Sequence, residues 1–108
     1  MQYLFLNKSI LYTTTMRFLR ARIPAEPGNK MVQDPNFLTK LEEYINKVKP
    51  EAAYFMPVEG QRSMAYIVNV ERNDQLPSTV EPLFQWGANV DVIPVMNFED
   101  LKNGLRNR

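Results

Sequence analysis

Hydrophobic and polar positions along the chain follow two different periods. Four stretches alternate with a period of two, which predicts strands, because successive side chains of a strand point to opposite faces of a sheet. The expected strands are Met16–Ile23, Ala52–Val58, 62–70 and 90–96. Residues 59–61 between the middle two strands are short enough to form a hairpin connection. The second and third strands in the sequence are therefore joined directly, whereas the first and the fourth are joined to them through longer segments.

The first long connection predicts a helix with one apolar stripe. Asp34 followed by Pro35 is typical of a helix start, where a carboxylate caps the end and proline occupies the first turn. Apolar residues then recur every three or four positions until Lys49 and Pro50, which stop the helix. The preceding segment, Ala25–Gln33, contains a proline and a glycine and is interpreted as a loop that leads into a short helical turn.

The second long connection predicts another helix. Asn73 or Asp74 is the expected cap, and Gly87 suits the carboxyl end. Pro82 lies inside this segment, and a proline removes one backbone hydrogen bond, so we expect a kink or a divided helix beside it. A short final helix is expected to begin at Asn97.

The order strand, helix, strand, strand, helix, strand predicts an α+β domain of the ferredoxin-like βαββαβ kind. Such a domain has a four-stranded antiparallel sheet with both helices on one face. Residues 16–108 are expected to form this single domain. Because Met16 opens a clean strand, residues 1–15 are interpreted as an N-terminal extension. It is either a segment added by an upstream start or a genuine extension of the natural chain.

Composition excludes several classes of chemistry. The chain has no cysteine and no histidine, so disulfides, Cys/His zinc sites and histidine-based proton transfer are not available. Thirteen Lys and Arg residues against twelve Asp and Glu give a net charge of +1, which provides no basic field for nucleic acid or a membrane surface. No glycine-rich phosphate loop is present. We therefore expect no metal and no nucleotide cofactor.

The chain shows no stretch typical of a secretory signal or a membrane-spanning helix. The cytoplasm is the expected location.

The second and third of the expected strands are apolar on both faces. In Ala52–Val58, Tyr54 and Met56 alternate with Ala53 and Phe55, and neither set is polar. A sheet exposed on one side normally carries polar residues there, so the side away from the helices is expected to be buried as well. Two copies packed sheet to sheet would bury it, and homodimerisation is therefore the expected assembly.

Four stretches of the sequence carry a family resemblance: RIPAEPGNK (22–30), KPEAAYF (49–55), EPLF (81–84) and PVMNFEDL (94–101). The chain resembles the dimeric α/β barrel superfamily, and within it a group of small uncharacterised bacterial proteins. More distantly it is similar to muconolactone isomerase-like, YCII-like and antibiotic-biosynthesis monooxygenase-like members. The resemblance implies a homodimeric barrel but no particular reaction, because this scaffold carries several unrelated activities. Relatives that use a catalytic or metal-binding histidine have no counterpart here, since the chain lacks that residue.

The strongest candidate ligand-binding residues are Arg20 and Arg22. Both share one strand face with Phe18, and a buried arginine must be paired or must meet an anion. If that face turns into the dimer, the guanidinium groups are expected to hold a carboxylate, with Tyr54 and Tyr66 as pocket walls. Alternatively, one arginine pairs with an acid of the chain and the other is solvated.

Other residues are weaker candidates. Glu51 and Glu81 are flanked by apolar segments, which makes them candidate catalytic proton-transfer groups, and together with Asp91 they are also possible ion-pair partners of the arginines. Asn29 and Trp86 are placed where they would form the rim of a pocket. The alternative is that Asn29 closes a turn and Trp86 seals the core.

The sequence thus leads to two functional hypotheses. The first is a homodimer that binds or converts a small anionic organic molecule in an interior pocket. The second is a non-catalytic interaction or regulatory module whose sheet face is an interface. An RNA-recognition module is a third, because residues 62–69 match its third-strand motif at Arg62, Ala65, Tyr66 and Ile67. They lack its glycine and two of its aromatic residues.

Overall fold

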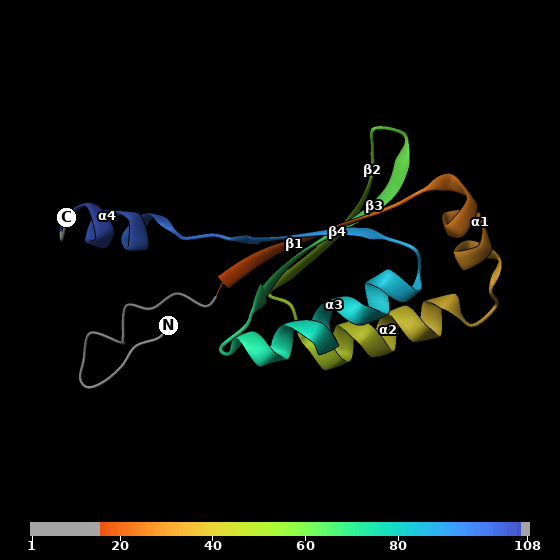
Figure 1. The fold of residues 1–108 in the computed structure, drawn as a ribbon, viewed down its shortest axis with the longest axis horizontal. Helices are drawn as coiled ribbons and strands as arrows, with labels where there is room; N and C mark the ends of the chain where they lie inside the picture. Colours follow the sequence, from red (N-terminus) through yellow and green to blue (C-terminus); the bar gives the residue numbers. More distant parts are fainter. Residues whose placement is uncertain (1–15, 107–108) are drawn as a thin grey trace.

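A computed structural model describes residues 16–106 of the chain (Figure 1). The elements, in chain order, are β1 (Met16–Ile23), α1 (Ala25–Gln33), α2 (Phe37–Val48), β2 (Ala52–Val58), β3 (Gln61–Asn69), the 3₁₀ helix η2 (Asn73–Gln75), α3 (Leu76–Gln85), β4 (Asn89–Pro94) and α4 (Phe98–Arg106). The expected N-terminal extension, residues 1–15, lies outside the described residues.

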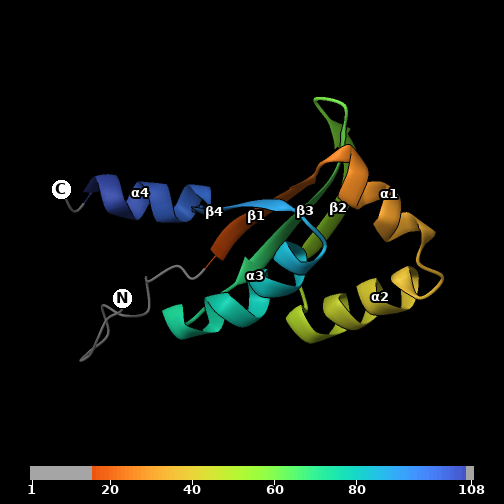
Figure 2. The ribbon, with the colours of Figure 1, turned by 45° about the vertical axis from the view of Figure 1, so that its right-hand side comes forward.

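The strands form one four-stranded sheet in the order β2-β3-β1-β4, with every pair of neighbours antiparallel. Helices α2 and α3 lie side by side on the same face of this sheet, as two views agree (Figures 1 and 2). The predicted α+β class and antiparallel sheet are confirmed, and the strand order is compatible with a ferredoxin-like fold. Within the chain the sheet is open and does not close into a barrel.

The strands match the sequence pattern closely, and the hairpin is tighter than expected. Strands β1 and β2 have the predicted bounds, whereas β3 and β4 each begin one residue earlier. Glu59 and Gly60 form the whole turn, with φ of 52° and 78°. Two consecutive residues with positive φ are typical of the turn whose twist matches that of the flanking strands. Gln61 consequently belongs to β3.

The prediction for Ala25–Gln33 was wrong, because this segment is a helix of nine residues, α1. Pro27 lies in its first turn, where the backbone N–H groups have no partner within the helix, so a missing donor does no harm there. The Gly28 N–H donates to the Pro24 carbonyl at 2.9 Å and closes that first turn.

Helix α2 begins at Phe37, two residues later than predicted, because Asp34 organises the turn before it. The Asp34 carboxylate accepts hydrogen bonds from the Asn36 backbone N–H and from Lys40 Nζ, both at 2.9 Å. These bonds, that of Lys40 foremost, stabilise the charged form and lower the pKa of Asp34.

Helix α3 continues through Pro82 and is not divided there, contrary to one form of the prediction. It ends at Gln85, and Gly87 follows its carboxyl end as expected, with a φ of 85° that favours glycine. A Cβ atom at this position would also lie 2.5 Å from Pro27 Cβ, so both the backbone and the neighbouring helix α1 require glycine.

The core lies between the sheet and the pair α2 and α3. Alternate residues of β1 and β3 point into it, with side chains of both helices opposite; its largest fully buried members are Tyr66, Leu19, Ile23, Leu83 and Val68. Tyr44 of α2 packs against Tyr66 with ring centroids 5.6 Å apart. Burial raises the pKa of both phenols. Among residues 16–106, no helix is long and apolar enough to cross a bilayer.

Candidate functional site

The sheet face away from α2 and α3, called here the open face, is ordered by the strand register into three rows. The first row is apolar and consists of Ala52, Ile67, Phe18 and Ile93. The second row consists of Tyr54, Ala65, Arg20 and Asp91. The third row consists of Met56, Ser63, Arg22 and Asn89. The open face is therefore apolar at one end and polar along β1 and β4 at the other.

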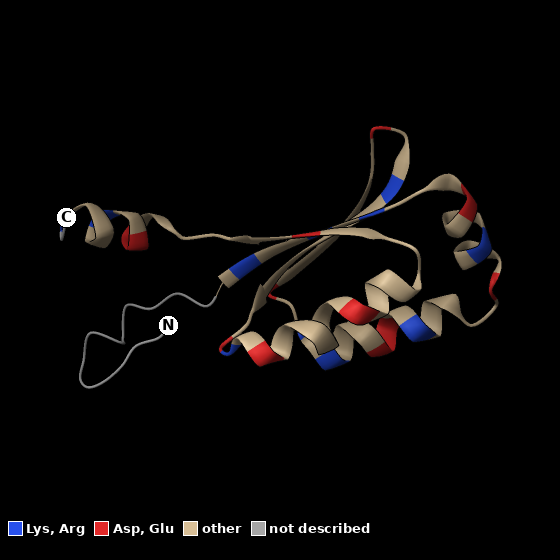
Figure 3. Ribbon diagram, viewed as in Figure 1, with Lys and Arg blue, Asp and Glu red and all other residues tan. Residues whose placement is uncertain are grey.

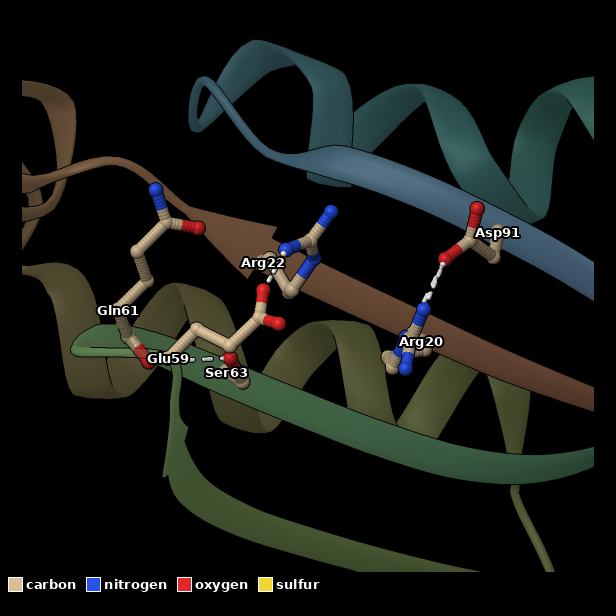
Figure 4. A network of polar contacts seen from close by, with 6 residues as sticks. All are labelled: Arg20, Arg22, Glu59, Gln61, Ser63 and Asp91. Carbon is tan, nitrogen blue, oxygen red and sulfur yellow. Dashed lines mark hydrogen bonds and ion pairs between the residues drawn. The ribbon is translucent and has the colours of Figure 1, made fainter.

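Arg20 is held by the acid directly opposite it on β4. Its Nε and Nη2 both donate to Asp91 Oδ2, at 3.2 and 2.8 Å (Figure 4). Asp91 was one of the partners anticipated for an arginine in the alternative interpretation. Both side chains are partly exposed, so the pair fixes the orientation of Arg20 more than it stabilises the fold.

Arg22 is held by the hairpin turn. Its Nη1 donates to Glu59 Oε1 at 2.9 Å, so Arg22 is ion-paired as well and does not match the expectation of a solvated second arginine (Figure 4). Its Nε is buried and has no hydrogen-bond partner in the part of the chain that the structure describes. The Oε1 atom of Gln61, two residues before Ser63 on the same face of β3, is buried without a partner in the same way.

Buried polar atoms in folded proteins almost always have a hydrogen-bond partner. The open face thus retains an unused N–H donor and an unused acceptor near its polar end. The basic and acidic residues of the chain are otherwise interspersed over the ribbon rather than gathered by sign (Figure 3).

The two tyrosines expected as pocket walls lie on opposite faces of the sheet. Tyr54 is on the open face in the same row as Arg20, and its side chain is 63% exposed. Tyr66 pairs with Leu19 and is fully buried under the helices, where its hydroxyl donates to Met64 Sδ at 3.1 Å. Tyr66 therefore cannot line a pocket with the arginines, and it is not accessible for stacking on a base.

The structure does not bring the candidate acids together. Glu51 lies just before β2 and accepts a hydrogen bond from Asn69 Nδ2. Glu81 lies on α3 and accepts one from Gln85 Nε2 at 2.7 Å. Both are exposed and neither contacts Arg20 or Arg22. The acid that contacts Arg22 is Glu59.

Asn29 and Trp86 lie on the helix side of the sheet. Asn29 Oδ1 accepts a hydrogen bond from Arg62 Nη1 at 3.0 Å. Trp86 packs edge-on against Phe37, with ring centroids 5.5 Å apart, and against Tyr44 at 6.1 Å. The position of Trp86 matches the alternative interpretation, in which it seals the core.

The residues that sequence reasoning missed are Glu59, Gln61 and Ser63. A turn of two residues aligns Ser63 with Met56 across the hairpin, and the β1 register then sets Ser63 opposite Arg22. Glu and Gly at the turn were a signal of this length, but a connection of three residues was equally consistent with the pattern. Among residues 16–106, no group of three or more acids is arranged to hold a metal ion.

An open groove with a volume of about 820 Å³ lies on the helix side, between α1, α2 and the β2–β3 hairpin. Its lining includes Val32, Leu38, Leu41 and Phe55, and it does not include Arg20, Arg22 or Tyr54. Met56, Gln61 and Ser63 also line it, so the groove borders the third row of the open face at the hairpin without reaching the two arginines.

Comparison with known proteins identifies no family model that matches the chain and no similar curated protein.

Proposed function

We propose that the chain forms a homodimer through its open face and holds a small anionic organic molecule between the two sheets. This is the assembly implied by the resemblance to dimeric α/β barrel proteins. The molecule would be bound without a metal or a nucleotide.

The dimer is supported by the apolar part of the open face. No described element covers the row that contains Phe18, Ile67 and Ile93, while α2 and α3 cover the opposite face (Figure 2). Tyr54 extends this apolar area and is largely exposed in the single chain. A second copy related by a two-fold axis would cover both open faces with the same contacts.

The ligand is supported by one observation, the buried Nε–H of Arg22 that lacks a hydrogen-bond partner. Glu59 already fixes the guanidinium through Nη1, so the Nε–H is preoriented towards a missing acceptor. A carboxylate oxygen forms a strong bond of this kind with a guanidinium. The apolar side chains Phe18 and Met56 on the same face would contact the rest of the molecule.

Binding has more support than catalysis. Proton transfer needs an acid or a base within hydrogen-bond reach of the reacting atoms. Glu51 lies before β2 and Glu81 lies on α3, so the two acids are not together, and Glu59 is already paired with Arg22. Conversion of the bound molecule would therefore depend on Glu59 as the proton acceptor.

A second candidate function is a non-catalytic interaction module with the open face as its interface. It is favoured by the ion pairs of Arg20 with Asp91 and of Arg22 with Glu59. Both positive charges are already neutralised by the chain itself, so two open faces can meet without an anion between them.

Native mass spectrometry of the gently purified full chain tests this proposal, because it reports the oligomeric state and any retained molecule together. We expect a dimer with a discrete additional mass. A bare dimer favours the second candidate function, and a stable monomer contradicts both.

Variants assign the site. Arg22→Gln is expected to lose the additional mass and keep the dimer, and Arg20→Ala is expected to lose retention with the fold intact, because it removes the neighbouring guanidinium. Arg17→Gln is the matched control, since Arg17 lies on β1 but outside the open-face rows and, within residues 16–106, its side chain donates to the Met16 carbonyl and to no acidic side chain. Unchanged retention in Arg22→Gln would overturn the assignment.

A further inference from the structure

Helix α4 has an apolar stripe that no other element packs against within residues 16–106. It begins with a capping box, in which the Asp100 N–H donates to Asn97 Oδ1 at 2.8 Å and the Asn97 N–H donates to Asp100 Oδ2. Phe98, Leu101 and Leu105 recur at a spacing of three and four residues, and Phe98 is 70% exposed. The helix projects beyond the end of the sheet in both views (Figures 1 and 2). A capped amphipathic helix of this kind requires an apolar surface.

The groove on the helix side is such a surface. Leu38 of α2 is 74% exposed at its wall, and Val32 of α1 and Phe55 of β2 are about half exposed. Exposed apolar side chains on three elements around one hollow are typical of a groove that receives the apolar face of a helix.

Helix α4 does not line the groove of its own chain. The groove lies at the β2 edge of the sheet and at the far end of β1, while Pro94, which pairs with Arg17, lies on the opposite edge at the near end. Three strand spacings make the separation about 14 Å across the sheet, and six residues of β1 make it about 20 Å along it. Residues 95–97 place Phe98 no more than about 14 Å from Pro94, and α4 points away from the groove in both views (Figures 1 and 2). The copy of α4 that we place in the groove therefore comes from a second molecule.

The charges of the two surfaces are complementary. Arg62 lines the groove and donates to the neutral Asn29, and it has no carboxylate partner among residues 16–106. Helix α4 carries Glu99 and Asp100 in its first turn, beside Phe98 (Figure 3). Within the described residues, the ion pair of Glu99 is a long one of 3.5 Å with Lys102 at the surface, so its carboxylate is free to exchange partners.

We infer that α4 of one copy docks into the groove of a second copy, with Phe98 and Leu101 against Leu38 and Phe55 and with Glu99 beside Arg62. The two-fold axis of the open-face dimer would make this contact twice, so that both contacts close within one dimer and do not extend into a filament. The groove does not include Arg20 or Arg22, although Met56 borders both the groove and the proposed ligand site, and the docking goes beyond the proposed function.

Cross-linking between cysteine variants tests the docking directly, because the chain has no cysteine of its own. Leu101→Cys and Leu38→Cys are made in separate full-length chains of different tag length, mixed, and treated with a short bismaleimide. Both side chains are exposed in the single chain, so neither change unfolds it. We expect a mixed cross-linked dimer in high yield.

The matched control replaces Leu38→Cys by Lys47→Cys, an exposed position on the opposite side of α2. The expected yield with Lys47→Cys is several-fold lower. Arg62→Glu should reduce the Leu101–Leu38 cross-link, and Glu99→Arg added to it should restore the yield.

Equal yields at Leu38 and Lys47, or no cross-link at Leu38, would overturn the docking. Loss of the cross-link in a chain that still gives a ligand-bearing dimer by mass spectrometry contradicts the docking alone. A cross-link at Leu38 without a retained molecule supports the docking and contradicts only the ligand proposal.

Discussion

The two faces of the sheet differ in what the chain itself supplies to complete them. Leu19 and Phe18 are neighbours on β1 and point to opposite faces. Leu19 is fully buried beneath the helix layer, while Phe18 is only partly buried on the open face. One face of β1 is thus covered by the helices of its own chain, whereas the other face requires a partner to cover it.

The polar groups show the same difference. On the helix side, the Tyr44 hydroxyl donates to the Thr79 carbonyl at 2.8 Å and the Tyr66 hydroxyl donates to Met64. On the open face, Arg22 Nε and Gln61 Oε1 are buried without partners in the described structure. Stability is therefore concentrated on the helix side, and the open face is where binding is expected.

The largest expected effect is on the helix face. Leu19→Ala removes a fully buried side chain and should lower the free energy of unfolding by about 2 to 5 kcal/mol through lost burial and a cavity. Urea denaturation measures this loss, and it should be the same at low and high protein concentration. A loss of unfolding free energy that appears only at high protein concentration would mean that Leu19 acts through assembly. It would contradict the view that the helix face is complete within one chain.

Phe18→Ala should act mainly on the dimer, because Phe18 lies in the apolar row of the open face. We expect the dissociation constant to rise about ten- to a hundred-fold, equivalent to about 1.4 to 2.8 kcal/mol. Sedimentation equilibrium measures it, with Phe18→Leu as the control that keeps most of the apolar area. An unchanged dimer constant would remove the open face from the interface.

The smallest expected effects compare a satisfied polar group with an unsatisfied one. Tyr44→Phe deletes the hydrogen bond to Thr79 and should lower the free energy of unfolding by about 0.5 to 1.5 kcal/mol. Gln61→Met removes an acceptor that has no partner and should leave stability unchanged or slightly raised. Thermal unfolding of both variants, freed of any bound molecule, is the measurement. A clear destabilisation by Gln61→Met would show that this amide is bonded within the protein.

Local patterns were sufficient for most of the fold. The alternation of residues 16–23 predicted β1 to the residue, and the Asn97 cap correctly placed the start of α4. These features depend on neighbours in the chain, whose side chains and backbone make the deciding contacts. Helix α1 was missed because a proline disfavours a helix everywhere except in the first turn. The position of that first turn depends on where β1 ends in the folded structure.

The candidate site was predicted only in part, for a related reason. The period of two placed Arg20, Arg22 and Phe18 on one face of their strand. For Tyr54 and Tyr66 it showed only which neighbours in the same strand share their face. It did not relate the faces of different strands, because a shift of one residue in register exchanges them. The observed register buries Tyr66 and exposes Tyr54.

The sequence by itself determined the kinds of element, their order and the absence of histidine and cysteine chemistry, since these depend on local periodicity and residue type. Only the tertiary structure decided which face of each strand the helices cover, that Glu59 rather than Glu51 or Glu81 contacts Arg22, and that α4 projects away from the groove. These outcomes depend on contacts between residues far apart in the chain, which strand register and helix packing fix together.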